Sequence, residues 1–203
     1  MATSPLEFCV LGVGHLAAAV RTQLPLFGLT VAEADEHAAR RVILACSDYE
    51  SASSFADANR RAVRDGYAIL FAWITSGRIE VGPLVVPLES PCFECRVAQR
   101  RDFSLSHRPP CLGSGSPPAT LNPDSRLWSL AQLGALLVAR EACALRLAAP
   151  EARLTGRVAK FDPPCIFPEI IEFGRRADCA VCGRVAEAIP AIVPLRSPPG
   201  SAR

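Results

Sequence analysis

The sequence has little charge imbalance and few of the features that mark specialised classes of protein. Its 203 residues carry 22 basic and 20 acidic side chains, which gives a net charge of +2. A dedicated nucleic-acid binder would show a basic excess or stripe, so this balance argues against that class. Charged residues make up 21% and hydrophobic residues 50% of the chain, which excludes a mostly disordered protein. A chain of this length can bury a hydrophobic core without disulfides or metal ions to stabilise it.

The sequence also lacks an export signal and a long apolar run. Its N-terminus has no basic segment and reaches Glu7 almost at once. The most apolar stretch, residues 127–149, is interrupted by Arg140, Glu141 and two further polar residues. It falls short of the roughly 20 apolar residues that a membrane span needs. We therefore expect a cytoplasmic protein that binds neither membrane nor nucleic acid.

The first third of the chain alternates short apolar segments with helix-like segments. The predicted strands are residues 6–11, 29–32, 42–46 and 67–74. The predicted helices are residues 16–24, which should end before Pro25, residues 33–41, and residues 53–64, which should end at Gly66. Strands that are apolar throughout are buried on both faces. The pattern predicts an α/β fold with a truncated, Rossmann-like parallel sheet and helices on both faces.

The pattern changes after residue 77. We predict a Rossmann-like half over residues 1–77, a C-terminal α+β part over residues 78–186, and a disordered, proline-rich tail over residues 187–203. The C-terminal part begins with a hairpin arm over residues 78–87 and a helical turn over residues 96–101. Its other elements are a long helix over residues 125–148 and strands over residues 154–161 and 166–173.

The nine cysteines include two Cys-x-x-Cys pairs, Cys92 with Cys95 and Cys179 with Cys182. Without an export signal, such pairs point to metal ligands or free thiols and not to disulfides. Two such pairs complete a tetrahedral four-thiolate zinc site of the structural type, which here would tether the C-terminal part. A redox pair, an iron–sulfur cluster and a set of buried core thiols are the alternatives.

A glycine turn follows the first predicted strand and reads Gly12-x-Gly14-x-x-Ala17. Glycines in such a turn allow a pyrophosphate to approach a helix N-terminus, and Glu33 is spaced to bind a ribose. Asp48 follows a later strand, where it could hold a metal ion on a nucleotide. Gly12, Gly14 and Asp48 are thus candidate nucleotide ligands. The alternative is a turn that serves packing and binds nothing.

The cysteine pairs and the α/β half together resemble the ubiquitin-activating-enzyme-like superfamily of the ThiF and MoeB type. Residues 79–95, IEVGPLVVPLESPCFEC, are similar to a branch with the pattern VGP(L)VxPGExxCxxC, which ends in CPVCG; here residues 179–183 read CAVCG. That branch holds ThiF-like cyclodehydratase partner and leader-peptide-binding proteins of azole-forming ribosomal peptide biosynthesis. The resemblance spans roughly residues 6–184.

The chain departs from the adenylating members of this superfamily at the nucleotide site. Those members carry an arginine and a lysine that contact phosphates, and an Asp-Asn pair after a later strand. The segment after the glycine turn is short here, and Arg21, Arg40 and Arg41 are only loose candidates for the phosphate-binding arginine. Asp48 is followed by Tyr49 and not by the asparagine of the Asp-Asn pair. Taken together, the resemblance and these departures imply that the chain has no catalytic residues and binds no ATP or Mg²⁺.

The resemblance thus predicts a non-catalytic scaffold or partner subunit of a YcaO-type cyclodehydratase that modifies a ribosomally made precursor peptide. Its partners would be the YcaO-type enzyme, a leader-peptide-binding protein that supplies the missing winged-helix-like module, the precursor peptide, and a second copy of the chain. The alternatives are an ATP-dependent adenylating enzyme and a nicotinamide-dependent oxidoreductase, for which no convincing catalytic Tyr-Lys or His partner is present. We expect partner contacts at the loop 102–124 and at residues 78–89, which can present an edge strand.

Overall fold

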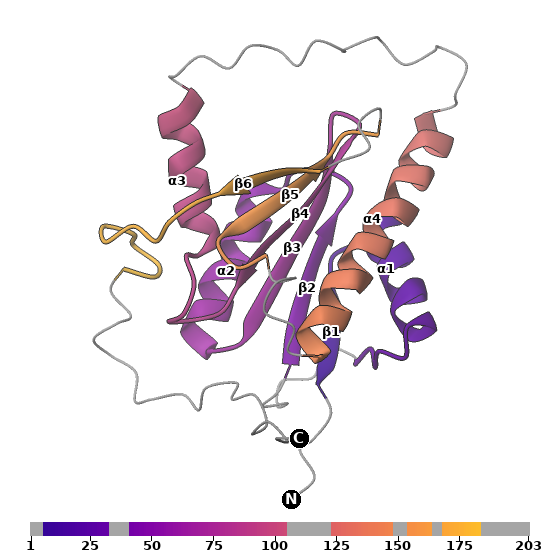
Figure 1. The fold of residues 1–203 in the computed structure, drawn as a ribbon, viewed down its shortest axis with the longest axis horizontal. Coiled ribbons are helices and arrows are strands. Elements are labelled where there is room, and N and C mark those ends of the chain that lie inside the picture. Colours follow the sequence, from indigo (N-terminus) through magenta and orange to yellow (C-terminus); the bar gives the residue numbers. More distant parts are fainter. Residues whose placement is uncertain (1–5, 33–40, 105–122, 148–153, 164–167, 184–203) are drawn as a thin grey trace, which may run out of the picture.

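A computed structural model describes residues 6–32, 41–104, 123–147, 154–163 and 168–183. Six strands of this part form one mixed sheet in the order β1-β2-β3-β4-β5-β6 (Figure 1). The elements in chain order are β1 (Glu7–Leu11), α1 (His15–Leu26), β2 (Arg41–Ser47), α2 (Ala52–Asp65), β3 (Ala68–Thr75), β4 (Arg78–Val85), α3 (Phe93–Ser104), α4 (Pro123–Arg146), β5 (Arg157–Phe161) and β6 (Glu169–Glu172).

The first three strands pair in parallel, as the apolar segments predict. Phe8 of β1 lies opposite Val42 of β2, which in turn lies opposite Ala68 of β3. The predicted strand at residues 29–32 is reduced, within the described residues, to one parallel bridge between Phe8 and Val31. The predicted helix at residues 33–41 lies almost wholly outside the described residues, and so does Glu33.

Strands β4 to β6 continue the same sheet with antiparallel pairing. The hairpin between β3 and β4 turns at Ser76 and Gly77, which both have positive φ, as the tightest hairpin turns require. Strand β4 confirms the predicted hairpin arm, but it pairs with β3 on one edge and β5 on the other. The expectation that residues 78–89 present an edge strand is therefore wrong, because both edges of β4 are hydrogen-bonded within the sheet.

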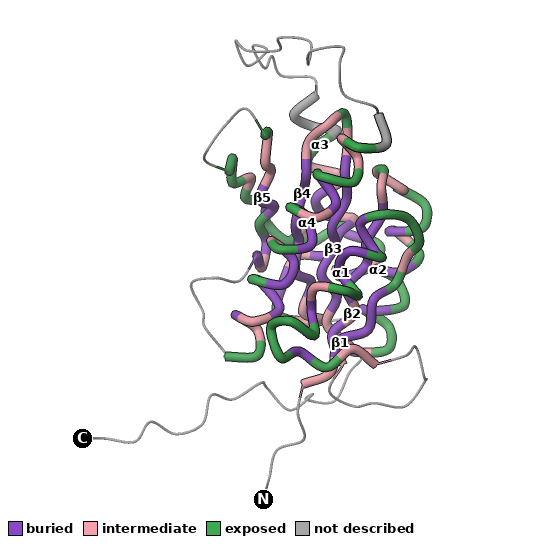
Figure 2. Tube along the Cα trace, turned by 90° about the vertical axis from the view of Figure 1, so that its right-hand side faces the viewer, coloured by how far each residue is buried: buried purple, intermediate pink, exposed green. Residues whose placement is uncertain are grey.

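Helices cover both faces of the sheet, which confirms the predicted α/β layering (Figure 1). On one face, α1 and α4 pack over an aliphatic core that includes Leu16, Val20 and Ala135. On the other face, α2 and α3 pack over an aromatic core that includes Trp73 and Phe93. Figure 2 shows the buried residues running along the strands and the sheet-facing sides of the helices.

The helix ends follow local chemistry with two departures from prediction. Helix α1 continues through Pro25, because a proline in the last turn gives up a single backbone hydrogen bond. Helix α3 begins three residues earlier than expected. Helix α2 ends at Gly66 in the left-handed conformation, as predicted. No helix of the described part is long and apolar enough to cross a membrane. Residues 105–122 of the predicted contact loop and the tail lie outside the described residues.

Candidate functional site

The glycine turn joins β1 to α1 at the carboxyl edge of the parallel strands. Gly12 has a φ of +126° and Gly14, the N-cap of α1, a φ of +100°. A Cβ on Gly12 would collide with the carbonyl oxygen of Cys46 on β2. Glycine is thus required here by backbone conformation and by the close approach of two backbones, whether or not a ligand binds.

Asp48 fills the N-terminal end of α1. Its carboxylate accepts hydrogen bonds from the backbone N–H of His15 at 2.7 Å and of Leu16 at 2.8 Å, and lies 3.1 Å from Nδ1 of His15. A Cβ on Gly14 would collide with this carboxylate. The first N–H groups of a helix and its dipole form the place where an anion is most stable. In this protein the anion is a side chain of the chain itself.

The candidate phosphate-binding arginines do not face this end of α1. Arg21 donates from one guanidinium nitrogen to the carbonyls of Val10 at 2.9 Å and Gly12 at 3.0 Å, and so holds the turn from within. Arg41 is the first residue of β2 and lies opposite Glu7, the first residue of β1, in the strand register. Arg41 is therefore at the amino-terminal ends of these strands, whereas the glycine turn is at their carboxyl ends. Arg40 lies outside the described residues. Among the described residues, the sequence candidates thus supply no free cation to a phosphate at the turn.

The second site is the cluster of Cys92, Cys95, Cys179 and Cys182, whose sulfur atoms all lie within 4.8 Å of one another. Separations are 4.0 Å from Cys92 to Cys95, 3.6 Å from Cys92 to Cys179 and 3.4 Å from Cys95 to Cys182. Four sulfurs bound tetrahedrally at about 2.3 Å from a zinc ion are about 3.8 Å apart. All four thiols are free and buried, so the fold brings together the predicted ligand set.

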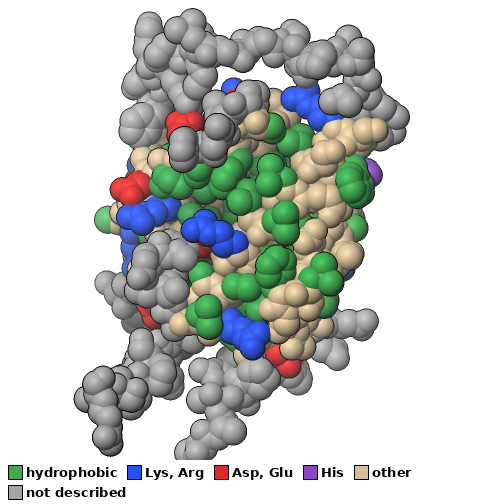
Figure 3. Space-filling model, turned by 45° about the vertical axis from the view of Figure 1, so that its right-hand side comes forward, with side chains coloured by type: hydrophobic (Ala, Val, Ile, Leu, Met, Phe, Trp, Pro, Cys, Tyr) green, Lys and Arg blue, Asp and Glu red, His purple; other side chains and the backbone are tan. Residues whose placement is uncertain are grey.

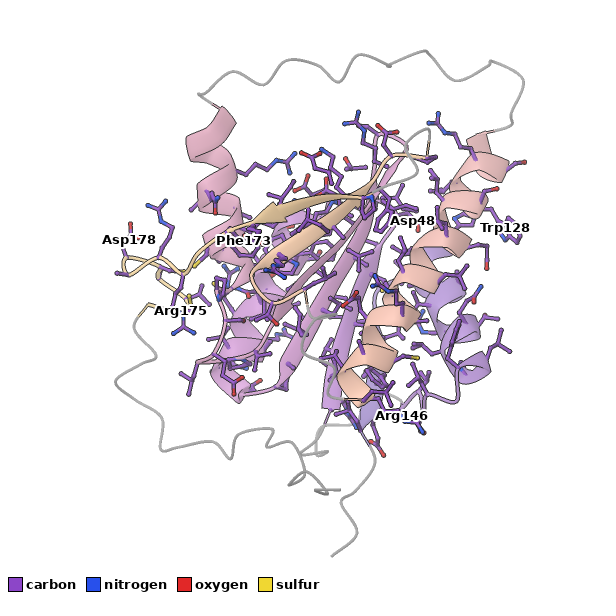
Figure 4. The ribbon with its side chains drawn as sticks, viewed as in Figure 1. Asp48, Trp128, Arg146, Phe173, Arg175 and Asp178 are labelled. Carbon is purple, nitrogen blue, oxygen red and sulfur yellow. The ribbon has the colours of Figure 1, made fainter. Side chains whose placement is uncertain are left out.

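Two short turns present the four sulfurs. The carbonyl of Cys92 accepts from the N–H of Cys95 at 3.1 Å, where α3 begins, and the carbonyl of Cys179 accepts from Gly183 at 2.9 Å. Figure 4 shows the second turn, beside Arg175 and Asp178, at the end of the sheet that α3 covers. Arg175 donates to the carbonyl of Ser90 at 3.0 Å, which joins the two turns outside the cluster.

Burial of the cluster opposes negative charge on its sulfurs, and nearby hydrogen-bond donors offset part of this effect. Burial raises the pKa of the Cys92 thiol far above its usual value and that of Cys182 to about 11. An ion is therefore needed to hold these sulfurs as thiolates. The backbone N–H of Arg176 donates to the sulfur of Cys95 at 3.5 Å. Asn59, fully buried on α2, offsets a small part of the rise in the pKa of Cys92, and its side-chain N–H group has no other acceptor among the described residues. Such donors around sulfur support a bound metal.

A buried ion pair locks the helix that follows the first cysteine pair. Arg96 of α3 donates to Glu80 of β4 at 2.6 Å, and the two side chains are only 7% and 5% exposed. The guanidinium also lies over the ring of Trp73, 4.5 Å from its centre, and 3.6 Å from Glu50. Arg100, one turn later, contacts Glu50 at 2.6 Å. These contacts fix α3, and with it Cys95, against the sheet.

Known structures share this fold, whereas no family model and no curated protein matches the chain. A heterocyclase in complex with substrate and cofactor matches with a TM-score of 0.63 and 18% identity, over 88% of this chain and 26% of the heterocyclase. The heterocyclase TruD matches with a TM-score of 0.58 and 21% identity, over 89% of this chain and 28% of TruD. E. coli MccB matches with a TM-score of 0.60 and 15% identity, over 88% of this chain and 65% of MccB.

This likeness establishes the fold, and at that level it confirms the resemblance found in the sequence. The chain spans about a quarter of the length of the two heterocyclases and just under two thirds of MccB.

Proposed function

We propose that the chain is a non-catalytic scaffold subunit of a YcaO-type cyclodehydratase complex that forms azoline or azole rings in a ribosomally made precursor peptide. The sequence resemblance supports this function, and so does the fold shared with two heterocyclases, one of them in complex with substrate and cofactor. The observation that carries the non-catalytic role is the carboxylate of Asp48 at the N-terminus of α1, where a nucleotide phosphate would otherwise bind.

The electrostatics of the glycine turn support this role. A triphosphate at α1 would have to displace Asp48 or place its own negative charges within a few ångströms of that carboxylate. Two unit charges 4 Å apart repel by about 4 kcal/mol at an effective dielectric constant of 20. Arg21 cannot compensate without leaving the two carbonyls that it holds. Gly12, Gly14 and Asp48 then serve packing and capping, and ATP would be used by the partner enzyme.

We further propose that the four cysteines hold a structural Zn²⁺. Four thiolates close the coordination sphere and leave no position for a substrate, so the ion would stabilise the fold without taking part in a reaction. It would join the start of α3 to the segment after β6. This tether supports the division into a Rossmann-like half and a zinc-bound C-terminal part.

The outer side of α4 supports a role that depends on surface contacts. Four large hydrophobic side chains are exposed here: Trp128 (57%), Leu133 (40%) and Leu136 (43%) of α4, and Leu147 (76%), the residue after it. The opposite side of the helix is buried against the sheet and α1. Figure 3 shows hydrophobic side chains spread over the face that includes α4. A helix that is apolar on both sides is usually covered on both sides. We assign this surface, the outer face of α4, to the YcaO-type enzyme.

Co-expression with a YcaO-type cyclodehydratase from the same locus tests the scaffold function. A stable complex should elute together on size exclusion, and ring formation in the precursor peptide should require the chain. Leu133→Ser with Leu136→Ser should weaken the complex, whereas Leu26→Ser, an exposed leucine at the end of α1, should not. A homodimer would elute before the monomer when the chain is run alone. If no locus-encoded enzyme binds the chain, the scaffold function is wrong.

An ATP-dependent adenylating enzyme is the second candidate function. The observation that favours it is that a structure of E. coli MccB with ATP shares the fold, with a TM-score of 0.59 and 15% identity. Pyrophosphate exchange in the presence of the precursor peptide separates the two functions. We expect exchange at background. Robust exchange that is lost in Asp48→Ala would establish adenylation instead.

A further inference from the structure

Asn59 is a polar residue on the buried side of α2. The other buried residues of this helix, Phe55, Ala58, Ala62 and Val63, are apolar and belong to the aromatic core, whereas Asn59 brings an amide to the same side and is fully buried. A buried amide lowers stability unless its hydrogen-bonding groups find partners. The partners of Asn59 therefore indicate what the amide is for.

The oxygen of the amide has a partner at the start of α3. Oδ1 of Asn59 accepts from the backbone N–H of Phe93 at 3.1 Å. Phe93 is the first residue of α3, so this N–H is one of those that a helix start leaves without a partner in the helix. The bond joins two helices through residues 34 positions apart, and it holds the residue that follows Cys92.

The nitrogen of the amide has no such partner. Nδ2 of Asn59 is buried and makes no hydrogen bond among the described residues. The group that it acts on is the sulfur of Cys92: burial raises the pKa of this thiol most, and the Asn59 amide offsets part of that rise. A thiol is a weak acceptor, whereas a charged acceptor forms much stronger hydrogen bonds. The donor thus fits a thiolate that is bound to a metal ion.

Other sulfurs of the cluster have donors from within the two cysteine turns or close to them. The backbone N–H of Arg176 donates to Cys95 at 3.5 Å, and the backbone N–H groups of Val181 and Cys182 act on the sulfur of Cys179. Asn59 differs because it belongs to α2, a helix that supplies no cysteine to the cluster.

We propose that Asn59 is a positioning residue of the metal site, which donates from Nδ2 to the Cys92 thiolate while Oδ1 accepts from Phe93. The inference rests on the structural zinc ion of the proposed function. Four thiolates around one divalent ion leave an excess of negative charge, which a donor outside the ligand set reduces. Metal affinity then depends on α2, and the first cysteine turn is held against that helix.

Metal affinity and the cobalt spectrum of the full chain test this role. Co²⁺ takes the same kinds of ligand as Zn²⁺, and it gives absorption bands in which charge moves from sulfur to metal. Asn59→Leu should weaken Zn²⁺ binding about 10–100-fold in competition with a chelator, the loss typical when such a partner is removed. It should also move the sulfur-to-cobalt bands to longer wavelength, because a sulfur without its donor gives up electron density more easily.

Asn59→Asp separates this role from helix capping alone. Aspartate is as good a cap as asparagine and keeps the acceptor for Phe93, but its carboxylate cannot donate to a sulfur. Capping alone predicts wild-type affinity, whereas the proposed role predicts a loss at least as large as in Asn59→Leu. Val63→Ala is the matched control, since it loosens the same side of α2. It should lower the melting temperature and leave the cobalt bands in place.

The band positions decide the outcome. Unchanged bands in the Asn59 variants would overturn the proposal, even with a loss of affinity, because Asn59 would then act through packing. If Asn59→Leu does not fold, the bands of Asn59→Asp decide alone. A wild-type chain without bound metal would refute the zinc site itself, and this inference with it. The scaffold function is scored separately, by whether the wild-type and Asn59→Leu chains elute with the YcaO-type enzyme.

Discussion

The two faces of the sheet are held together in different ways. On the face covered by α1 and α4, leucine, valine and alanine side chains fill the core, and the one carboxylate at the turn is satisfied by the backbone of α1. On the face covered by α2 and α3, four aromatic rings pack beside four thiols and a buried ion pair. Among the described residues, the turn on the first face is satisfied by the chain's own Asp48, whereas the second face gathers four buried thiols that could hold a metal ion.

This difference reverses what the motifs alone imply about binding. A glycine turn before a helix is the usual place for a ligand, yet here the chain's own Asp48 occupies it. The cysteine pairs, which come from opposite ends of the C-terminal part, form the preorganised site. Function would then depend on a metal-held frame and on surfaces, with the α2–α3 face supplying rigidity.

The largest effect should follow from loss of one metal ligand on the α2–α3 face. Cys179→Ser should abolish stoichiometric zinc and lower the melting temperature by roughly 10 °C or more, because metal binding free energy is folding free energy in such sites. Elemental analysis and thermal melting of the purified chain measure both quantities.

Cys143→Ser is the matched control for that substitution. Cys143 is half-buried on α4 and lies outside the cluster, so zinc content should not change. Wild-type protein without metal, or with iron and its visible absorbance, would contradict a structural zinc site.

The buried ion pair on the same face should give the next largest effect. Arg96→Met alone should destabilise the fold by about 3–5 kcal/mol, because it leaves the buried carboxylate of Glu80 without a partner. The double variant with Glu80→Leu should recover most of that loss. Denaturant unfolding of both single variants and the double variant measures the coupling. Additive losses would mean that the pair does not act as a unit.

On the α1–α4 face, removal of the carboxylate cap should cost less. Asp48→Ala leaves the N–H groups of His15 and Leu16 without their acceptor and should lower stability by about 1–2 kcal/mol. Asp48→Asn keeps one acceptor oxygen, so its stability should lie between that of the wild type and that of Asp48→Ala. Denaturant melts measure the series. An Asp48→Ala chain as stable as the wild type would show that the carboxylate does not cap α1.

An effect of similar small size concerns Glu141, a buried acid on α4. Burial raises its pKa to about 7, against the attraction of Arg140 at 3.6 Å. The folded protein thus binds a proton that the unfolded chain releases near pH 4.5, so stability is highest below that pH and falls as pH rises toward 7. Glu141→Gln should remove about 1–2 kcal/mol of the difference between pH 5 and pH 8. An unchanged pH profile would mean that Glu141 is solvated.

The sequence predicted the parallel strands, the helices that cover them and the four cysteines, because each has a strong local pattern. Continuous apolar runs fix β2 and β3, Gly66 fixes the end of α2, and two residues between cysteines fix each metal turn. The sequence could not predict that β4 is paired on both sides, because a Gly-Pro break occurs in edge strands and in inner strands alike.

Long-range polar contacts were also missed. Nothing in the sequence pairs Asp48 with the N–H groups of α1, 32 and 33 residues earlier. Glu80 inside an apolar strand was the available signal for a buried ion pair, because an isolated charge in a buried strand requires a partner. Leu88 has a φ of +68° at the position where the branch pattern has glycine, a departure that the sequence showed without its conformational meaning.

Calorimetric titration of Mg-ATP into the zinc-loaded full chain tests the central claim most directly, because that claim is that Asp48 has taken the place of a phosphate at α1. We predict no saturable heat up to millimolar nucleotide for the wild-type chain. Saturable binding at micromolar ATP, weakened in Asp48→Ala, would contradict the account and make the glycine turn a nucleotide site.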